Sequence, residues 1–322
     1  MKKIIFFAAV IFALISNQGG AQITDSSKSK IQNMELENFD KLWDYNKPAE
    51  TEVKFRAILD RVKPEDDLSY YVQLFTQIAR TQGLQRKFDD AHKTLDEAES
   101  LLTADLKLAK VRYLLERGRV YNSSGKPDTA RSYFDQAFEL AKEIGEDFYA
   151  VDALHMIAIT EKPEKALEWN LKAIDYTEKS TDTRAKGWLG SLYYNTGWSL
   201  FDLGKYSEAL EIFKKGQQFR EEKKQDSEIR IAKWCVARTL RALNKIDEAL
   251  NMQRALLEEF NKIGEKDGYV FEELGECYLV LGRSDDAEKY FKSAYEELSK
   301  DDYLVNNEQK RIERIKELGK VK

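Results

Sequence analysis

The stretch Gly204-Lys205-Tyr206-Ser207-Glu208-Ala209-Leu210 recurs along the chain in altered form. It returns at residues 244–250 as Asn-Lys-Ile-Asp-Glu-Ala-Leu, and more divergent copies stand at residues 86–91, 125–130, 161–166 and 282–287. The alanine that all six copies share stands at positions 91, 130, 166, 209, 249 and 287, so successive copies lie 39, 36, 43, 40 and 38 residues apart. A period in this range indicates stacked pairs of helices.

Small and bulky side chains keep fixed places around each shared alanine. Small residues stand twelve before it in five copies and seven after it in five copies, and a phenylalanine stands four after it in three. Small side chains let two helix backbones approach, and bulky ones fill the adjoining holes. These positions hold Ala79, Gly118, Gly197, Ala237 and Gly275, then Ala98, Ala137, Ala173, Gly216 and Ala294, and Phe134, Phe213 and Phe291. Since one helical hairpin cannot bury its apolar face alone, we expect six stacked hairpins to share a continuous core.

This pattern resembles that of tetratricopeptide repeat proteins. The sixth copy keeps it best, with Gly275, Tyr278, Ala287, Phe291 and Ala294. The second and fourth copies match nearly as well, with Gly118, Tyr121, Gly125, Ala130, Phe134 and Ala137, and with Gly197, Gly204, Tyr206, Ala209 and Phe213. The resemblance covers about residues 70–303 and implies an all-α fold, a right-handed α-α superhelical solenoid of about six hairpins. The period exceeds the family's usual value of about 34 residues, which implies longer helices or longer connections.

Two copies depart from the pattern. In the third, Leu154 replaces the small residue and Asn170 the aromatic one, and in the fifth, Gln253 and Leu256 stand at two of the conserved places. We expect these two hairpins to be distorted, because a changed side-chain volume alters how closely two helices pack.

The chain divides into four predicted segments. Residues 1–21 form a signal peptide, 22–66 a polar lead-in with N-terminal capping helices, 67–303 the repeat array and 304–322 a C-terminal capping helix. Lys2 and Lys3 precede an apolar run that ends in small residues before Ala21, as in exported proteins, although a buried N-terminal helix is the alternative. Cleavage near Ala21 would remove two lysines and no acids, changing the net charge from −5 to −7. We therefore expect an exported chain, periplasmic or secreted, without stable membrane insertion.

Capping helices are predicted at both ends of the array. Residues 36–43 and 52–62 suit two helices broken by the Asn-Lys-Pro sequence at 46–48. Near the other end, Ile312, Ile315 and Leu318 form a narrow apolar stripe on an otherwise charged helix. Such a stripe is typical of a terminal cap with one solvated face. A coiled-coil seam for a partner is the alternative.

Composition and motifs disfavour several functions. The 52 basic and 57 acidic residues are mixed along the chain, with no basic block to bind nucleic acid. No phosphate-binding loop, dinucleotide fingerprint or metal motif is present, and His92 and His155 stand apart. We predict no catalytic activity, no cofactor and no metal. Cys235 and Cys277 fall in apolar helical patterns and are expected as buried free thiols, with a disulfide as the alternative because they lie about one repeat apart.

A candidate binding surface follows from the resemblance, since the first helix of each pair faces a concave groove in that family. Eleven residues before the shared alanine, a position expected in the groove, stand Arg80, Arg119, His155, Trp198, Arg238 and Glu276. One turn earlier stand Thr76, Leu115, Val151, Tyr194, Trp234 and Glu272, and Arg241 lies three beyond Arg238. The predicted peptide-binding groove comprises Arg80, Arg119, His155, Tyr194, Trp198, Trp234, Arg238 and Arg241.

The chemistry of these residues suits a locally basic, aromatic surface. Arginine binds carboxylates with a planar fork, and Trp and Tyr give large, rigid contact areas. The alternative is that the aromatics pack between hairpins and the arginines pair with nearby acids.

These features favour a non-catalytic protein-protein interaction scaffold in the cell envelope. Its partner would be a protein or peptide, offering an acidic segment or a C-terminal carboxylate to the groove. A ligand-sensing or input module of a signalling system is the alternative. An enzyme with an unrecognised site is the third hypothesis, and it would require a cluster of perturbed titrating groups.

Overall fold

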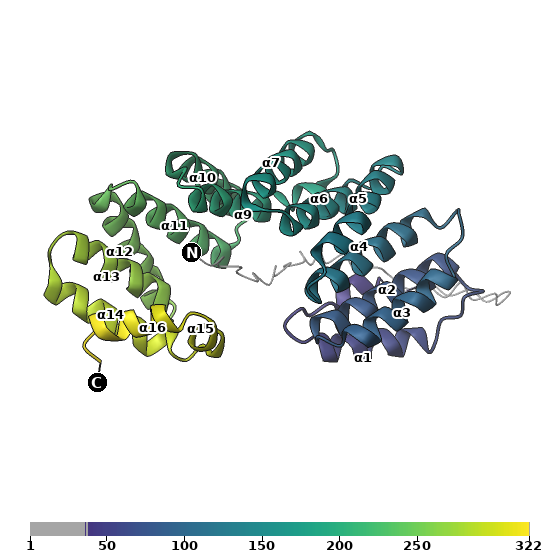
Figure 1. Ribbon diagram of the computed structural model, residues 1–322, viewed down its shortest axis with the longest axis horizontal. Coiled ribbons are helices and arrows are strands. Elements are labelled where there is room, and N and C mark those ends of the chain that lie inside the picture. The colour runs from purple at the N-terminus through teal and green to yellow at the C-terminus, as the bar shows by residue number, and fades with distance from the viewer. Residues whose placement is uncertain (1–35, 37, 322) are drawn as a thin grey trace, which may run out of the picture. The chain divides into compact units, whose positions relative to one another are not determined.

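A computed structural model of the chain describes residues 36 and 38–321. The predicted signal peptide, residues 1–21, and most of the lead-in lie outside the described residues. Helices are the only regular secondary structure of the described part (Figure 1), which confirms the predicted all-α fold. No helix there combines the length and the apolar character that a membrane span needs.

The helices follow one another with short connections. In chain order they are η1 (Phe39–Leu42), α1 (Pro48–Leu59), α2 (Leu68–Leu84), α3 (Phe88–Ser100), α4 (Lys107–Ser123), α5 (Pro127–Glu143), α6 (Asp147–Thr160), α7 (Pro163–Lys179), α8 (Thr183–Lys186), α9 (Leu189–Asp202), α10 (Tyr206–Glu222), α11 (Asp226–Ala242), α12 (Ile246–Lys262), α13 (Gly268–Val280), α14 (Ser284–Leu298), α15 (Asp302–Asn307) and α16 (Gln309–Leu318).

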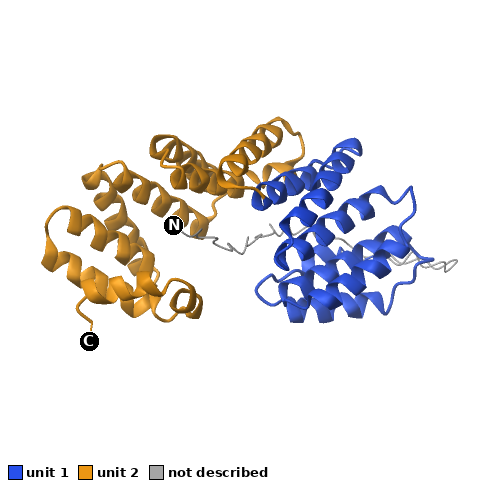
Figure 2. Cartoon of the chain, viewed as in Figure 1, with its two compact units in different colours: residues 1–160 blue, residues 161–322 orange. Residues whose placement is uncertain are grey.

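The chain forms two compact units, Met1–Thr160 and Glu161–Lys322 (Figure 2). Unit 1 contains the first two repeats, α2 with α3 and α4 with α5, and ends with α6. Unit 2 begins with α7 and contains the last three repeats, α9 with α10, α11 with α12 and α13 with α14. The division therefore falls inside the third copy, one of the two that depart from the pattern.

The recurring stretch forms the turn between the two helices of a pair. Its first residue takes a left-handed backbone conformation in five copies, with φ of 83° at Gly125, 73° at Gly204 and 70° at Gly282, and 61° at Arg86 and 60° at Asn244. This conformation ends the first helix, and in the fourth copy the following N–H returns to the helix, from Lys205 to the Leu200 carbonyl at 2.9 Å. Glycine adopts this conformation without a steric penalty, which explains its place in three copies.

The small and bulky positions meet across the pair in the second, fourth and sixth copies, as predicted. A Cβ atom built on Gly118 would lie 2.8 Å from Cδ1 of Phe134, and one on Gly197 would lie 2.6 Å from Cδ1 of Phe213. The aromatic ring thus occupies the space that the missing side chain leaves. The two helices approach closely because one side chain is absent and the other fills the gap.

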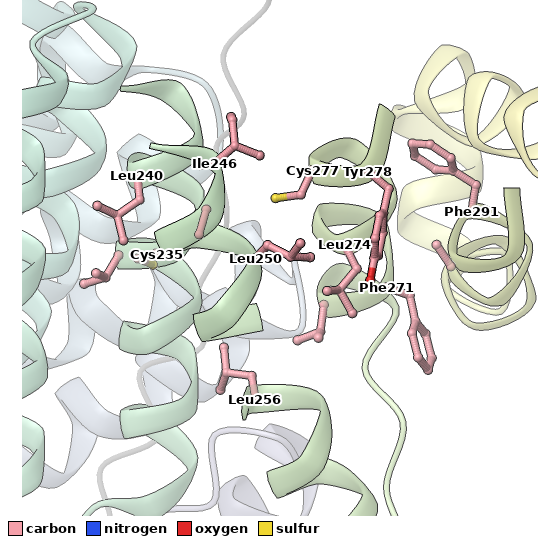
Figure 3. Packing of buried hydrophobic residues seen from close by; sticks show 14 of the residues in the cluster. Cys235, Leu240, Ile246, Leu250, Leu256, Phe271, Leu274, Cys277, Tyr278 and Phe291 are labelled. Atoms are coloured by element: carbon pink, nitrogen blue, oxygen red, sulfur yellow. The ribbon is translucent and has the colours of Figure 1, made fainter. Parts of the chain in front are cut away.

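The core of unit 2 continues from pair to pair. Leu250 of α12 and Leu274 of α13 are buried in one cluster, and Cys277 points from α13 toward α12 (Figure 3). Cys235 and Cys277 are buried free thiols, as expected from the sequence. Burial raises the pKa of Cys277 to about 12, which makes this thiol a poor nucleophile at neutral pH.

The divergent fifth copy keeps its helical pair but carries a polar residue in the core. Gln253 takes the place that phenylalanine has in other copies, and its side chain is fully buried. Among the residues that the structure describes, neither the nitrogen nor the oxygen of its amide group has a hydrogen-bond partner. Leu256, at the other changed position, is also fully buried.

Helices at the two ends cover the arrays within their units. Pro48 begins α1, where a missing backbone N–H costs nothing, and Phe55 of α1 packs with Leu74 and Ile78 of α2. At the other end, α16 packs on α14 with Ile312 and Ile315 buried in the core of unit 2. The short α15 crosses residue 303, where the predicted array ends.

Candidate functional site

Three of the predicted site residues lie in unit 1, and two of them, Arg80 and Arg119, take part in a chain of ion pairs. Arg80 of α2 donates to Glu116 of α4 at 3.1 Å. Arg119 of α4 donates to Glu116 at 2.6 Å and to Asp152 of α6 at 2.5 Å. His155 is buried on α6, and this burial lowers its pKa to about 4. The imidazole is therefore neutral at physiological pH.

Five predicted residues come together in unit 2, on α9 and α11. Tyr194 and Trp198 meet edge to face with ring centroids 6.2 Å apart, and Trp198 and Trp234 lie 5.9 Å apart. The guanidinium of Arg238 stands 5.3 Å from the Trp234 ring centroid and 5.9 Å from that of Trp198. All of these side chains, and that of Arg241, are partly exposed. We call these five residues the aromatic-arginine cluster.

The two arginines of the cluster share one buried acid. Arg238 donates to Glu273 of α13 at 2.5 Å, and Arg241 donates to the same carboxylate at 2.7 and 3.0 Å. Burial alone would raise the pKa of Glu273, but the two guanidinium groups outweigh it and hold the pKa below its usual value. The carboxylate fixes both arginines in place, and the indole N–H of Trp234 is fixed by the Tyr269 carbonyl at 3.1 Å.

Sequence reasoning missed the acids that hold these arginines. These acids stand fourteen residues before a shared alanine, three before the position that holds Arg80, Arg119 and Arg238 in the first, second and fifth copies. They are Glu116, Asp152 and Glu273. In each case the arginine belongs to one repeat and the acid to the next. The signal was present in the sequence, because three of the six copies carry an acid at this position.

The sequence-based prediction of the groove lining is wrong for some residues. Thr76, Leu115 and Val151 have at most 1% of their surface exposed, so they pack between helices. Four residues turn an α-helix by about 400°, so these side chains point about 40° away from the position eleven residues before the shared alanine. That rotation is enough to bury small and apolar residues against the next helix. Glu272 and Glu276 pair with Arg311 and Arg314 of α16.

The expectation of a locally basic surface also needs correction. In unit 1, Arg80 and Arg119 face Glu116 and Asp152, so two positive charges meet two negative ones. In unit 2, the ion pairs that Arg238 and Arg241 form within the described residues are both with Glu273. The arginines therefore pair with acids in both units, as the alternative expected, but in unit 2 two guanidinium groups share one carboxylate.

One open cavity lies away from all of these residues. It has a volume of about 560 Å³ between α4 and α5, and its lining includes Lys110, Leu114, Gln136 and Leu140. None of the predicted site residues lines it. In the part of the chain that the structure describes, no group of three or more His, Cys, Asp or Glu side chains could hold a metal ion.

Comparisons with known proteins agree with this architecture. Models of the tetratricopeptide repeat match residues 111–144, 190–222 and 237–302. No significant match to a curated protein sequence was found.

Three solved structures illustrate the fold. The apo form of RapI is 14% identical with a TM-score of 0.66, over 82% of this chain and 76% of that one. A STAND protein (signal transduction ATPase with numerous domains) with a tetratricopeptide repeat sensor, from Pyrococcus horikoshii, is 13% identical with a TM-score of 0.66, over 86% of this chain and 44% of that one. NprR in complex with its cognate peptide NprX is 14% identical with a TM-score of 0.52, over 86% and 82%. Identities this low show the fold alone.

The repeat models, the turn residues and the glycine-phenylalanine contacts all point to one family. The matched segments contain Gly118, Gly197 and Gly275 together with Phe134, Phe213 and Phe291. The chain contains tetratricopeptide repeats over residues 111–144, 190–222 and 237–302.

Proposed function

We propose that the chain is a non-catalytic interaction module that binds a protein or peptide through the aromatic-arginine cluster of unit 2. The observation that carries the proposal is the convergence of Tyr194, Trp198, Trp234, Arg238 and Arg241, all partly exposed, on neighbouring first helices. Partly exposed Trp, Tyr and Arg side chains are the residues that most often dominate the binding energy of protein interfaces.

The arrangement of the cluster favours a partner with a carboxylate near an apolar group. Glu273 and the rings of Trp198 and Trp234 hold Arg238 in one orientation, so binding costs little side-chain entropy. Arg241 shares the same acid. Glu276 also acts on Arg241 but is itself paired with Arg314, so one positive charge is available to an acidic segment or a C-terminal carboxylate. Asp202 acts on Arg238 from a distance, but it is exposed and its charge is screened by salt.

The comparisons support this proposal at the level of the fold. One of the similar structures, NprR, is described in complex with its cognate peptide. A second candidate function is ligand sensing, because another similar structure carries a tetratricopeptide repeat array described as a sensor. Both functions use the array to bind another molecule, and they differ in whether the bound molecule is a protein segment or a small ligand.

We further propose that the module acts in the cell envelope after cleavage near Ala21. The proposal rests on the basic start, apolar run and small residues at positions 1–21. Fractionation of the source cells accompanies the binding experiment below. Recovery of the chain outside the cytoplasm with Gln22 as its first residue is the expected result, and recovery of the uncleaved chain from the cytoplasm would contradict it.

The binding experiment is an affinity pull-down from the envelope fraction with the chain beginning at Gln22. The test variant combines Trp234→Phe with Arg238→Gln, which removes the indole N–H and the guanidinium while keeping bulk in the core. Its matched control combines Trp169→Phe with Lys172→Gln on α7, a second helix of the same unit, where the ammonium stands 4.4 Å from the ring centroid. Circular dichroism checks that all three chains keep their helices.

We expect the unmodified chain and the control to retain the same protein, and the test variant to lose at least nine tenths of it. Equal retention by all three chains would show that the partner binds elsewhere. If no protein is retained, the interaction proposal is wrong, and thermal-shift measurements with metabolites become the test of ligand sensing.

A further inference from the structure

A short segment near the start of the described chain, residues 38–45, lies against the first helices of unit 1. Asp40 accepts two hydrogen bonds from the guanidinium of Arg112 on α4, at 2.6 and 2.9 Å. The indole N–H of Trp43 donates to Gln77 of α2 at 3.0 Å. The segment thus reaches two successive repeats through its own side chains.

The segment contacts the same helix face that carries predicted site residues. Its Tyr45 ring stands 5.5 Å from the guanidinium of Arg80, one of those residues. Gln73, Gln77 and Arg80 follow one another at intervals of four and three residues, so they form one stripe on α2. Arg112 stands 39 residues after Gln73, the interval between the first two shared alanines, and therefore has the same register on α4. In unit 1 the chain itself covers this stripe.

The contacts at Arg112 show which chemistry this face accepts. Arg112 is 5% exposed, and its guanidinium lies 5.1 Å from the ring centroid of Phe39 and 5.7 Å from that of Tyr149. A carboxylate fills the two-pronged end of the guanidinium while an aromatic ring from the neighbouring residue covers its plane. Both interactions strengthen when water is excluded. At Arg112 the face thus holds an aromatic side chain next to a carboxylate.

The segment is attached in a way that a peptide could reproduce. Among the described residues, no backbone hydrogen bond joins residues 38–45 to α2 or α4, and the backbone of Asp44 bonds instead to Thr51 of α1. The Asp40 side chain remains 39% exposed. Phe39 is the anchor, since it is buried in the cluster that contains Phe55.

We propose that residues 38–45 occupy, in the same chain, a peptide-binding face formed by Gln73, Gln77, Arg80 and Arg112. A partner segment with a carboxylate beside an aromatic side chain competes for this face. The inference rests on the proposed function in that first helices bind peptides, but it concerns unit 1 and residues outside the aromatic-arginine cluster. If the pull-down contradicts binding at the unit 2 cluster, the proposal for unit 1 is unaffected. If the peptide experiment contradicts the proposal for unit 1, the proposal for the unit 2 cluster is unaffected.

The experiment uses a fluorescent synthetic peptide with the sequence of residues 38–45 and measures its binding by anisotropy. The full chain is compared with a loosened variant, Asp40→Ala with Trp43→Ala, which retains Phe39 as the anchor. It gives up three hydrogen bonds to the face and the ring contact of Trp43 with Phe55. We expect the peptide to bind the loosened variant at least ten times more tightly than the unmodified chain. Lys41→Ala is the matched control, because Lys41 is exposed on the same segment, and it should bind as the unmodified chain does.

Two further measurements locate the peptide. Adding Arg112→Ala to the loosened variant should abolish the gain, and a peptide with alanine in place of its first aspartate should bind at least ten times more weakly. If the loosened variant loses its helices, Asp40→Asn, which preserves the shape of the side chain, takes its place with an expected gain of about threefold. A folded loosened variant that binds no peptide, or binds it equally well without Arg112, overturns the proposal.

Discussion

At the scale of the residue, the distance between paired helices depends on the side-chain volumes of the two residues that face each other. In the second and fourth copies a glycine faces a phenylalanine, Gly118 with Phe134 and Gly197 with Phe213. In the fifth copy Ala237 takes the glycine's place and Gln253 the aromatic one. The pair still packs, but a primary amide is buried there without a hydrogen-bond partner, which costs roughly 1 to 3 kcal/mol.

Replacing Gln253 should therefore stabilise the protein. Met has a similar length and flexibility but no polar amide, so Gln253→Met should raise the free energy of unfolding by about 1 to 2 kcal/mol. Urea denaturation followed by circular dichroism measures the change. Gln218→Met, at an exposed position of α10, is the control and should change it by less than about 0.5 kcal/mol. A loss of stability in Gln253→Met would reveal a polar partner, such as a buried water molecule.

At the scale of the element, ion pairs fix the register between first helices of successive repeats. Within unit 1, Glu116 of α4 receives Arg80 from α2 and Arg119 from its own helix. Within unit 2, Glu273 of α13 receives Arg238 and Arg241 from α11. Because the acids are buried and the arginines only partly so, the acid is the member of each set that cannot turn to solvent.

Removing the charge of Glu116 should leave two arginines without their common partner. Glu116→Gln keeps the shape of the side chain, and we expect it to lower the free energy of unfolding by about 2 kcal/mol. That is less than the roughly 3 to 5 kcal/mol for a fully buried pair, because the arginines reach solvent. Denaturation of Glu143→Gln provides the comparison, since Glu143 and its partner Lys107 are exposed. If both variants lose the same amount, the Glu116 network contributes no more than a surface pair.

The elements could be predicted from the sequence because their packing repeats. The spacing of Gly275 and Phe291 reports one local contact, and six approximate copies of it indicate the whole array. The site was harder to predict, since the partner of Arg238 comes from the next repeat and depends on how two helices are rotated. Burial of Leu115 depends on the same rotation. Residues 38–45 belong to no repeat, so periodicity said nothing about where they lie.

At the scale of the whole molecule, the two units carry different titrating groups. In unit 1 the pKa of His155 is lowered by burial to about 4 from 6.5. In unit 2 two arginines hold the pKa of Glu273 below its usual value, and burial raises the pKa of Asp267. A repeat array can lose structure in one part before another, because each repeat is stabilised mainly by its neighbours. The units should therefore respond differently to mild acid.

Between pH 6.5 and 4 the unfolded chain binds a proton at His155 that the folded chain excludes. The stability of unit 1 is thus complete above pH 6.5 and falls as the pH drops toward 4, by about 2 kcal/mol at pH 5. Two arginines hold the pKa of Glu273 below its usual value, which opposes its protonation in mild acid, and protonation of Asp267 favours the folded state, so unit 2 should lose less. Hydrogen exchange measured by mass spectrometry at pH 7 and 5, corrected for intrinsic rates, resolves the two units. His155→Gln should remove most of the pH response of unit 1, and an unchanged response in that variant, or equal loss in both units, would show that other groups control acid stability.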